Sequence, residues 1–494
     1  MCSTIYIQKG DVTHMCNDII CSNNPVNKEE LSYPVTEAIL GGVDKGDASA
    51  VIDSVESYSA KKRQEILATK TEITVSGTSY YVSNDGDDEN DGKSPEKAWR
   101  TPAKVSAAEL CPGDGVFFKR GELFRGQVKT QAGVTYSAYG IGDKPKIYGS
   151  ERNYAEDKSF WKKTDKENIY VSSDTFDADV GVLVFDDGKY YTFKQIENFR
   201  GFDGELKEDL HMLHSKEDKH VYLYSVSDPN ERFFETEISP GRCGFCGNGN
   251  GVTVDNICLR YTGAHGFGYG HNTTGLTVQN CEIGWIGGMI QPGRAHENVR
   301  FGNGIEIYVG CKDFTVNNCW IYQCYDCGIT HQYFQKRDDF VNMENIKYTD
   351  NLIEYCVYAI EYINAQDPEK GIMKDVLFRG NVMTHTGEGF GSTRPDHGEA
   401  TVKGWHINNH AKNFIWYDNV IAATERVWNS NLVMLCVGKL AYMPAIVGNL
   451  FIGNHGSKFG FYGLSANFPK ERADYDEALM ERPELADNTF VFVK

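Results

Sequence analysis

The chain has 494 residues, which is long enough for two or three domains or for one long solenoid with additions. Its 50 Lys and Arg against 69 Asp and Glu give a net charge of −19, which argues against a nucleic-acid partner and an anionic membrane surface. The 50 Gly, 28 Tyr and 26 Phe are typical of a fold rich in turns and strands.

The cellular location is predicted from the amino terminus and the cysteines. The first residues contain no basic segment followed by an apolar core, so no secretory signal is visible. The most apolar stretch, 431–453, is interrupted by Lys439, Pro444 and Asn449 and is too broken for a membrane span. The 14 cysteines without a signal favour reduced thiols. We therefore expect a cytoplasmic protein, although a chain that had lost its leader would look the same and would be secreted.

Residues 1–77 are expected to form a helical segment. Between 47 and 70, Val51, Val55 and Tyr58 fall at i, i+4 and i+7 with charged residues between them, which is the pattern of an amphipathic helix. We expect this helix to cover an open end of a β-solenoid, where unpaired strand edges need protection.

Residues 78–150 are expected to form the first rungs of that solenoid, beginning with a strand at 80–82. The following loop, 84–91, holds five acids, but no bidentate Glu follows at the spacing of a calcium-binding loop, so we interpret it as solvated. Residues 151–242 are predicted to form an inserted β-rich lobe, which includes a strand at 181–185. Residues 466–494 are predicted to be a charged tail that ends in a strand at 489–493.

Between 243 and 465 an asparagine recurs just ahead of an apolar residue, at intervals of 24 to 38 residues. The apolar runs between the asparagines are short, β-branched and broken by Gly, which favours coils of strands over helical repeats. Asparagine suits the turn because it tolerates a positive φ, and stacked amides could form a hydrogen-bonded ladder. The pattern therefore predicts a right-handed parallel β-helix as the main domain. The repeated residues are Asn256, Asn280, Asn318, Asn351, Asn381, Asn419 and Asn449.

The cysteines offer two CxxC pairs, Cys243/Cys246 and Cys324/Cys327, whose four thiols could in principle bind zinc. The alternative is stronger, because Cys281 and Cys319 follow the repeated asparagine and take the inward position that Ile, Leu or Val fills elsewhere. Cysteine behaves there as a small buried hydrophobe. We predict no metal site.

A second strand follows each asparagine, and alternation along it places Phe267, Ile305, Ile329 and Ile360 in the core. The outward positions, Gly268, Glu306, Thr330 and Glu361, would then stack in one column. Neighbouring rungs lie ~4.8 Å apart, so Glu306 and Glu361, two rungs apart, would be separated by roughly 9–10 Å. Carboxylates at about 6.5–9.5 Å suit an inverting glycosidase, in which one acid protonates the leaving oxygen and the other activates water.

Other residues on these strands are candidates for the same site. Asp326 precedes the third strand and is the third catalytic candidate. Tyr308 and Gln332 are assigned to substrate binding. His331 is assigned there too, but it falls on the inward parity, so a hydrogen-bonded structural histidine is the alternative.

The segments 281–288 and 387–410 are predicted to supply further sugar contacts. Trp285, surrounded by glycines, is interpreted as a platform, with a core aromatic as the alternative. Trp405 offers a flat apolar face, while Arg394, Asp396 and Lys403 offer donors and acceptors. The alternative for the charged residues is a salt-bridged loop.

The run YYVSNDGDDENDGKSPEKAWRTPAKVSAAELCPGDGVFFKRGELFRG resembles the opening of pectate-lyase-like right-handed β-helix proteins. Pro102 stands where that family usually has Leu, which is a small departure. With the asparagine repeats, the resemblance covers roughly residues 79 to 465. It implies a β-helix and a carbohydrate-active protein, and it is far more specific for the fold than for the reaction.

The leading hypothesis is a glycoside hydrolase that cleaves an oligosaccharide or polysaccharide with Glu306 and Glu361 as its acid/base pair, without a cofactor. One alternative is a lyase or epimerase acting on uronic-acid sugars, in which Arg394 and Lys403 bind the substrate carboxylate and calcium assists. Another is a non-catalytic glycan-binding solenoid. The expected partner is a carbohydrate, and the oligomeric state is left open.

Overall fold

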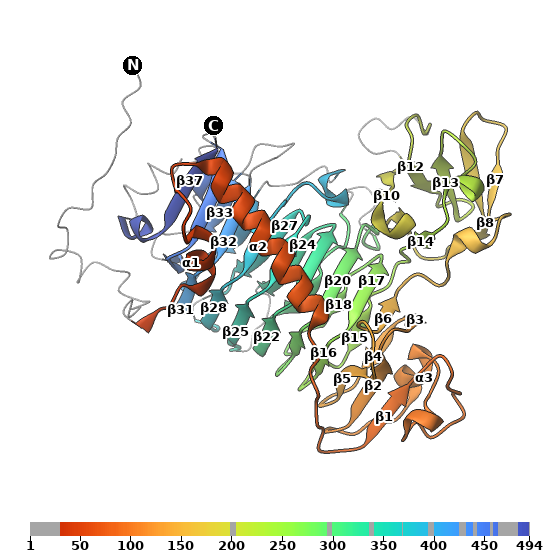
Figure 1. Cartoon of the computed structure of the whole chain (residues 1–494), viewed down its shortest axis with the longest axis horizontal. Helices are drawn as coiled ribbons and strands as arrows, with labels where there is room; N and C mark the ends of the chain where they lie inside the picture. The colour runs from red at the N-terminus through yellow and green to blue at the C-terminus, as the bar shows by residue number, and fades with distance from the viewer. Residues whose placement is uncertain are drawn as a thin grey trace.

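The structure is a computed structural model that describes residues 30–197, 204–293, 299–334, 340–367, 369–393, 400–423, 431–437, 442–454, 458–462 and 483–493. Its main body is a stack of coils, and each coil contributes one strand to each of three long parallel sheets (Figure 1). The predicted parallel β-helix is therefore confirmed. No helix in the described ranges has the length and apolar character needed to cross a membrane.

The sheets are named A, B and C in the order in which the chain visits them. Sheet A contains β1 (Ser79–Val82), β2 (Gly115–Lys119), β5 (Thr135–Tyr139), β16 (Thr253–Asp255), β19 (Thr277–Gln279), β22 (Lys312–Asn317), β25 (Met343–Thr349), β28 (Met373–Arg379), β31 (Lys412–Tyr417) and β34 (Ala445–Val447). Sheet B contains β3 (Leu123–Arg125), β6 (Lys146–Tyr148), β17 (Cys258–Thr262), β20 (Glu282–Ile286), β23 (Trp320–Cys324), β26 (Leu352–Glu354), β29 (Val382–Thr384), β32 (Val420–Ala423), β35 (Leu450–Asn454) and β37 (Thr489–Val493).

Sheet C contains β4 (Val128–Thr130), β15 (Phe245–Gly247), β18 (Phe267–Gly268), β21 (Ile305–Tyr308), β24 (Cys327–Tyr333), β27 (Tyr358–Asn364), β30 (Ala400–Ile407), β33 (Asn431–Val437) and β36 (Lys458–Tyr462). Side chains alternate along these short strands, so each coil sends apolar residues into one continuous core. Phe267, Ile305, Ile329 and Ile360 are all in that core, as predicted.

The predicted lobe is inserted between β6 and β15 and lies at one side of the stack (Figure 1). One of its sheets is formed by β11 (Phe193–Gln195), β12 (His211–His214), β13 (His220–Tyr224), β8 (Ile169–Thr175) and β7 (Trp161–Lys163), and the other by β10 (Tyr190–Tyr191), β9 (Leu183–Phe185) and β14 (Thr236–Ile238). Its short helices are η3 (Tyr154–Glu156), η4 (Asp186–Gly188) and α4 (Pro229–Arg232). The lobe has a small core of its own, which includes Phe160, Met212 and Leu223.

The predicted amino-terminal helix exists, but it does not close an end of the solenoid. α1 (Pro34–Leu40) and α2 (Ala48–Ala68) pack on the outer face of sheet B, with Val51 and Val55 against Leu352 and Val382. Figure 1 shows α2 running lengthwise across the coils. The outer face of sheet B carries apolar side chains, and burying them stabilises α2 where it lies.

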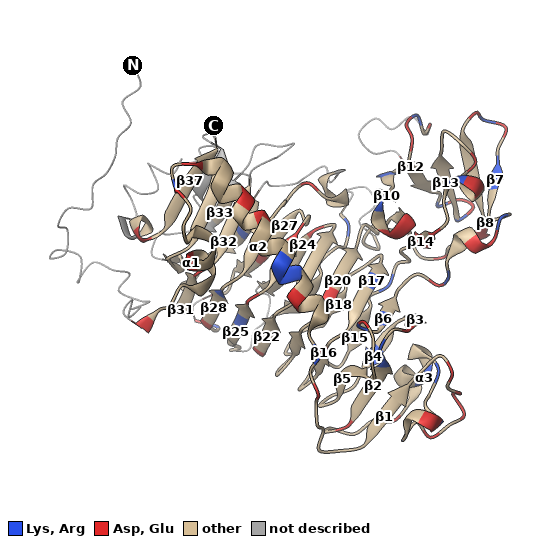
Figure 2. Ribbon diagram, in the orientation of Figure 1, with Lys and Arg blue, Asp and Glu red and all other residues tan. Residues whose placement is uncertain are grey.

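Figure 2 shows both acidic and basic residues along α2. The helix is tied to sheet B by Arg63, whose guanidinium donates to both oxygens of the buried Glu354 at 2.9 and 2.8 Å. The first coils are instead flanked by η2 (Pro95–Lys97) and by α3 (Pro102–Ala107), whose Val105 enters the core. The last described segments include η6 (Phe390–Thr393) and η8 (Pro483–Asp487).

The asparagine repeat proves to be two turn positions that differ by one residue. Asn318 has a positive φ of 51°. Its neighbour Asn317 pairs with Thr349 on the next coil. Asn318 therefore corresponds to Asp350, the residue after Thr349, and not to Asn351. The same positive φ occurs at Asn256 and Asn280. The single register predicted from the sequence is therefore wrong, because asparagine suits both positions for different reasons.

The four later asparagines point inward and form the predicted amide ladder. From Asn351 onward, each amide nitrogen donates at 2.9 Å to the amide oxygen one coil further on, and the series ends at Asn488. In the earlier coils Cys281 and Cys319 fill this inward position, and both are fully buried as predicted. The members of the ladder are Asn351, Asn381, Asn419, Asn449 and Asn488.

Candidate active site

The outward face of sheet C carries the predicted carboxylates in one column. The strand pairings align Gly268 with Glu306, Glu306 with Thr330, Thr330 with Glu361 and Glu361 with Lys403, each on successive rungs. The alignment derived from the sequence is therefore confirmed. The structure adds that Lys403 occupies the next position of the same column. A second column two residues further along the strands contains Tyr308, Gln332, Ile363 and Trp405.

Glu361 is held by a cation from the next rung. The Nζ of Lys403 lies 2.8 Å from the Oε2 of Glu361, and their side chains are only 11% and 9% exposed. The same Nζ lies 4.3 Å from the ring centre of Tyr358 and 4.9 Å from that of Trp405. An adjacent cation in a nearly dry setting favours the ionised carboxylate.

Glu306 is surrounded mainly by hydrogen-bonding groups. It is buried, the side-chain amide of Asn303 donates to its Oε2, and the Nδ1 of His265 lies 3.3 Å from the same oxygen. The phenol of Tyr308 also bonds Glu306. Burial, followed by the charge and hydrogen bond of Glu306, raises the pKa of Tyr308.

The orientation of the Asn303 amide is fixed by Cys327. The thiol of Cys327 lies 3.0 Å from the Oδ1 of Asn303, and its backbone N–H donates to the same oxygen at 3.4 Å. The amide oxygen therefore faces Cys327, and the amide nitrogen faces Glu306. Neither strand parity nor the repeat points to Asn303 or His265, although Asn303 precedes Glu306 by three residues in the segment GNGIEIY.

Asp326 joins the same group of acids from the turn between β23 and β24. Its backbone N–H donates to Gly302 at 3.1 Å, and its carbonyl accepts from Tyr358 at 3.0 Å. Burial raises the pKa of the Cys327 thiol, and the charges of Asp326, Glu361 and Glu306 raise it further. The amide of Asn303 links Glu306 to Cys327, the residue after Asp326, so the structure brings Glu306 and Asp326 together. Glu361 lies on the same column, two rungs from Glu306.

His331 does not face the column, and its assignment to substrate binding is wrong. It is fully buried among core aromatic rings, with its Nδ1 2.8 Å from the hydroxyl of Tyr348. Burial lowers the pKa of His331 to about 3, so the ring is neutral. Alternation along the strand turns His331 inward, so it is the hydrogen-bonded structural histidine that was the alternative.

Trp285 is not an exposed platform either. It is 4% exposed and packs against Tyr191 of the lobe and Phe390, with ring centres 5.5 and 6.0 Å away. The lobe can approach the indole this closely because it has a glycine there: a Cβ on Gly188 would lie 2.7 Å from the Trp285 ring. The core-aromatic alternative therefore holds.

The remaining predicted contacts divide into two groups. Tyr308, Gln332 and Trp405 lie on the outward columns beside the acids. Arg394 and Asp396 lie outside the described residues. Within the described ranges, no group of three or more His, Cys, Asp or Glu side chains is placed to hold a metal ion.

The chain resembles known proteins over parts of their length. No family model matches it. A lacto-N-biosidase of Bifidobacterium longum is 38% identical over 110 residues, which are 20% of this chain and only 7% of that protein. Two similar solved structures are a complex of XylC with xylose, at 13% identity and a TM-score of 0.45, and a GH136 lacto-N-biosidase from Eubacterium ramulus, at 14% and 0.42. The matches cover 80% and 90% of this chain and 73% and 70% of those chains, respectively.

Proposed function

We propose that the protein is a carbohydrate-active enzyme, a glycoside hydrolase whose acid/base pair is Glu306 and Glu361. The observation that carries this proposal is the register of sheet C, which sets these two carboxylates two rungs apart on one outward column. Two rungs correspond to roughly 9.6 Å between backbones, and glutamate side chains are long enough to bring their carboxyl groups closer than that. That separation suits an inverting reaction, which needs room for a water molecule.

The surroundings of the two carboxylates suggest their roles. Glu361 is paired with Lys403 and is the general base, because a base must be ionised before it takes a proton from water. Glu306 is buried and is bonded by neutral groups rather than by a lysine, so it takes the other role, that of the general acid, which gives its proton to the glycosidic oxygen. The bond between the anomeric carbon and that oxygen breaks as water adds from the opposite face.

The second outward column would hold the sugar. Gln332 supplies an amide. Trp405 presents a partly exposed ring, which contacts Lys403, the partner of Glu361. The local similarity to a lacto-N-biosidase supports an oligosaccharide substrate. Asp326 is the third candidate for either catalytic role, because it directly precedes Cys327, whose thiol contacts the Asn303 amide that bonds Glu306.

The test is incubation with a panel of neutral and acidic glycans. A hydrolase releases new reducing ends without ultraviolet absorption, whereas a lyase yields an unsaturated product that absorbs. Repeating the panel with a calcium chelator identifies any dependence on the metal. Reducing ends that survive the chelator support the proposal. An absorbing product, or binding of glycans without turnover, rejects it.

A further inference from the structure

A second site lies on the same face of sheet C, towards the first coils. The strand pairings continue the catalytic column backwards from Glu306 through Gly268 and Cys246 to Lys129. Three rung spacings separate Lys129 from Glu306, a path of roughly 14 Å. Between them the floor of this path is formed by Cys246 and, over Gly268, by Cys243 and His265: a Cβ on Gly268 would lie 2.9 Å from the Cys243 sulfur.

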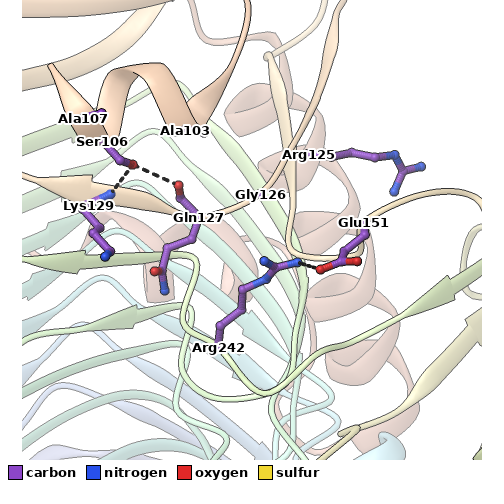
Figure 3. Close-up of a pocket in the computed structure, with 9 residues that line it drawn as sticks. All are labelled: Ala103, Ser106, Ala107, Arg125, Gly126, Gln127, Lys129, Glu151 and Arg242. Atoms are coloured by element: carbon purple, nitrogen blue, oxygen red, sulfur yellow. Dashed lines mark hydrogen bonds and ion pairs between the residues drawn. The ribbon is translucent and has the colours of Figure 1, made fainter. Parts of the chain in front are cut away.

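At the Lys129 end the column enters a pocket of about 690 Å³ (Figure 3). One wall is α3, where Ala103 and Ala107 are exposed and lie one turn apart, so they present a smooth surface of small side chains. Ser106 fixes that wall to the floor, because its hydroxyl donates to the carbonyl of Gln127 at 3.2 Å and accepts from the N–H of Lys129 at 2.9 Å.

The opposite wall is formed by the two connections that lead into and out of the lobe. Arg242 donates from one guanidinium nitrogen to the Glu151 carboxylate at 3.0 Å and to the carbonyl of Gly149 at 2.9 Å. Its Nε is buried and has no hydrogen-bond partner. Figure 3 shows Gln127, Lys129, Glu151 and Arg242 around one hollow.

The charges of the pocket are nearly balanced. Arg125 is neutralised by the buried Glu237, to which it donates two hydrogen bonds of 2.8 Å, and Arg242 is neutralised by Glu151. Lys129, which lines the pocket, forms no ion pair with an acidic side chain in the described part of the chain and is the one excess positive charge among these groups. The two guanidinium groups already have carboxylate partners, so neither needs an anionic ligand. They offer donors and acceptors side by side, which is what several neighbouring hydroxyl groups require.

We propose that this pocket is a distal subsite for an uncharged sugar unit of the same glycan that is cleaved at Glu306. Gln127, Glu151 and Arg242 would bind its hydroxyl groups, Lys129 would bind the sugar that follows, and the units between would pass over Cys246 and Cys243. The inference rests on the proposed function. It adds that the substrate is a glycan long enough to span the path from the catalytic column to α3.

The experiment fills the pocket without touching the catalytic residues. Ala107→Trp places a large side chain in the hollow from an exposed position, and Glu109→Trp, also exposed but outside the pocket lining, is the matched control. Binding of short and long neutral oligosaccharides is measured on a glycan array with the Glu306→Gln background, so that no turnover is needed. Binding of the same oligosaccharides is measured for Lys129→Ala and Gln127→Ala, and circular dichroism checks that each variant is folded.

Ala107→Trp is expected to weaken binding of the long oligosaccharides about tenfold, the equivalent of losing one or two hydrogen bonds, and to leave the short ones unchanged. Glu109→Trp should bind like its parent. Equal binding of long and short glycans by the parent, or unchanged long-chain binding in Ala107→Trp, overturns the subsite. Failure of the wild-type protein to cleave any glycan rejects the proposed function instead, while a loss of binding in Ala107→Trp would still support the pocket.

Discussion

Lys403 lies 2.8 Å from Glu361 and occupies the next rung of the same outward column, so the acid and its counter-ion are neighbours in the β-helix although 42 residues separate them in the chain. Glu306 is two rungs from Glu361 and receives hydrogen bonds from Asn303 and Tyr308. Two identical side chains are thereby given different surroundings, which is the condition for one to act as a base and the other as an acid.

Removal of the Lys403 charge should change the pH dependence of catalysis. Lys403→Met keeps the length of the side chain and leaves Glu361 nearly buried without its cation, so the ionised form of Glu361 is reached only at higher pH. The acidic limb of the pH–activity profile should move upward, with activity at neutral pH reduced by about tenfold or more. Lys403→Arg should keep the limb near its original position. An unshifted limb in Lys403→Met would mean that Glu361 is not the base.

Asn303 is expected to act as a positioning residue for Glu306. Asn303→Leu removes the amide that bonds Glu306 and leaves a buried shape of similar size, so kcat should fall by about 10- to 100-fold while KM changes little. Cys327→Ser keeps a donor for the Asn303 oxygen and serves as the control. Kinetic constants and the pH profile are measured for both variants. A fall confined to thermal stability, with kcat unchanged, would assign Asn303 a structural role only.

His331 should govern acid stability rather than activity. Its pKa is lowered to about 3 by burial, whereas an unfolded histidine titrates near ~6.5. The unfolded chain therefore gains a proton first as pH falls, and stability is lost between about pH 6.5 and pH 3. His331→Phe should flatten this loss in urea unfolding curves, at a cost of about 1–3 kcal/mol at neutral pH because Tyr348 loses its partner. A large loss of kcat in the refolded variant would contradict the structural role.

The amide ladder should be a principal source of stability for the later coils. Asn381 accepts from Asn351 and donates to both Asn419 and the carbonyl of Tyr348. Asn381→Ala leaves these buried groups unpaired, so we expect a loss of about 3 kcal/mol or more in the free energy of unfolding. Asn413→Gly, at an exposed position of β31 with a φ of 52°, is the control and should change stability by less than about 0.5 kcal/mol. Equal losses in the two variants would show that the buried ladder adds no more than an exposed asparagine.

The column of sheet C could be predicted because two short-range rules combine there. Alternation along a strand gives the side that each residue faces, and the repeat gives the rung, so Glu306 and Glu361 could be aligned without knowing any loop. The same parity rule correctly indicated an inward His331. The helix at 48–68 was predictable from its periodicity, but its location was not, because the apolar strip that it covers is formed by residues from several distant coils.

Other features depend on contacts between parts of the chain that are far apart in sequence. Trp285 is covered by Tyr191 of the lobe, and nothing local distinguishes a covered indole from an exposed one. Asn303 lies in an irregular loop, where neither parity nor period applies. The asparagine register was misjudged because the residue that best tolerates a positive φ is also a good amide for a buried ladder, so Asn318 and Asn351 look equivalent in the sequence.

The assignment of Glu306 and Glu361 as the acid/base pair is tested by the turnover of Glu306→Gln and Glu361→Gln on a glycan that the wild-type protein cleaves, with Glu89→Gln, at an exposed loop, as the matched control. Both site variants should keep the circular dichroism of the wild type and lose about 10²- to 10⁴-fold in kcat, while the control retains full activity. Wild-type kcat in either folded site variant would show that the substituted glutamate is not part of the acid/base pair.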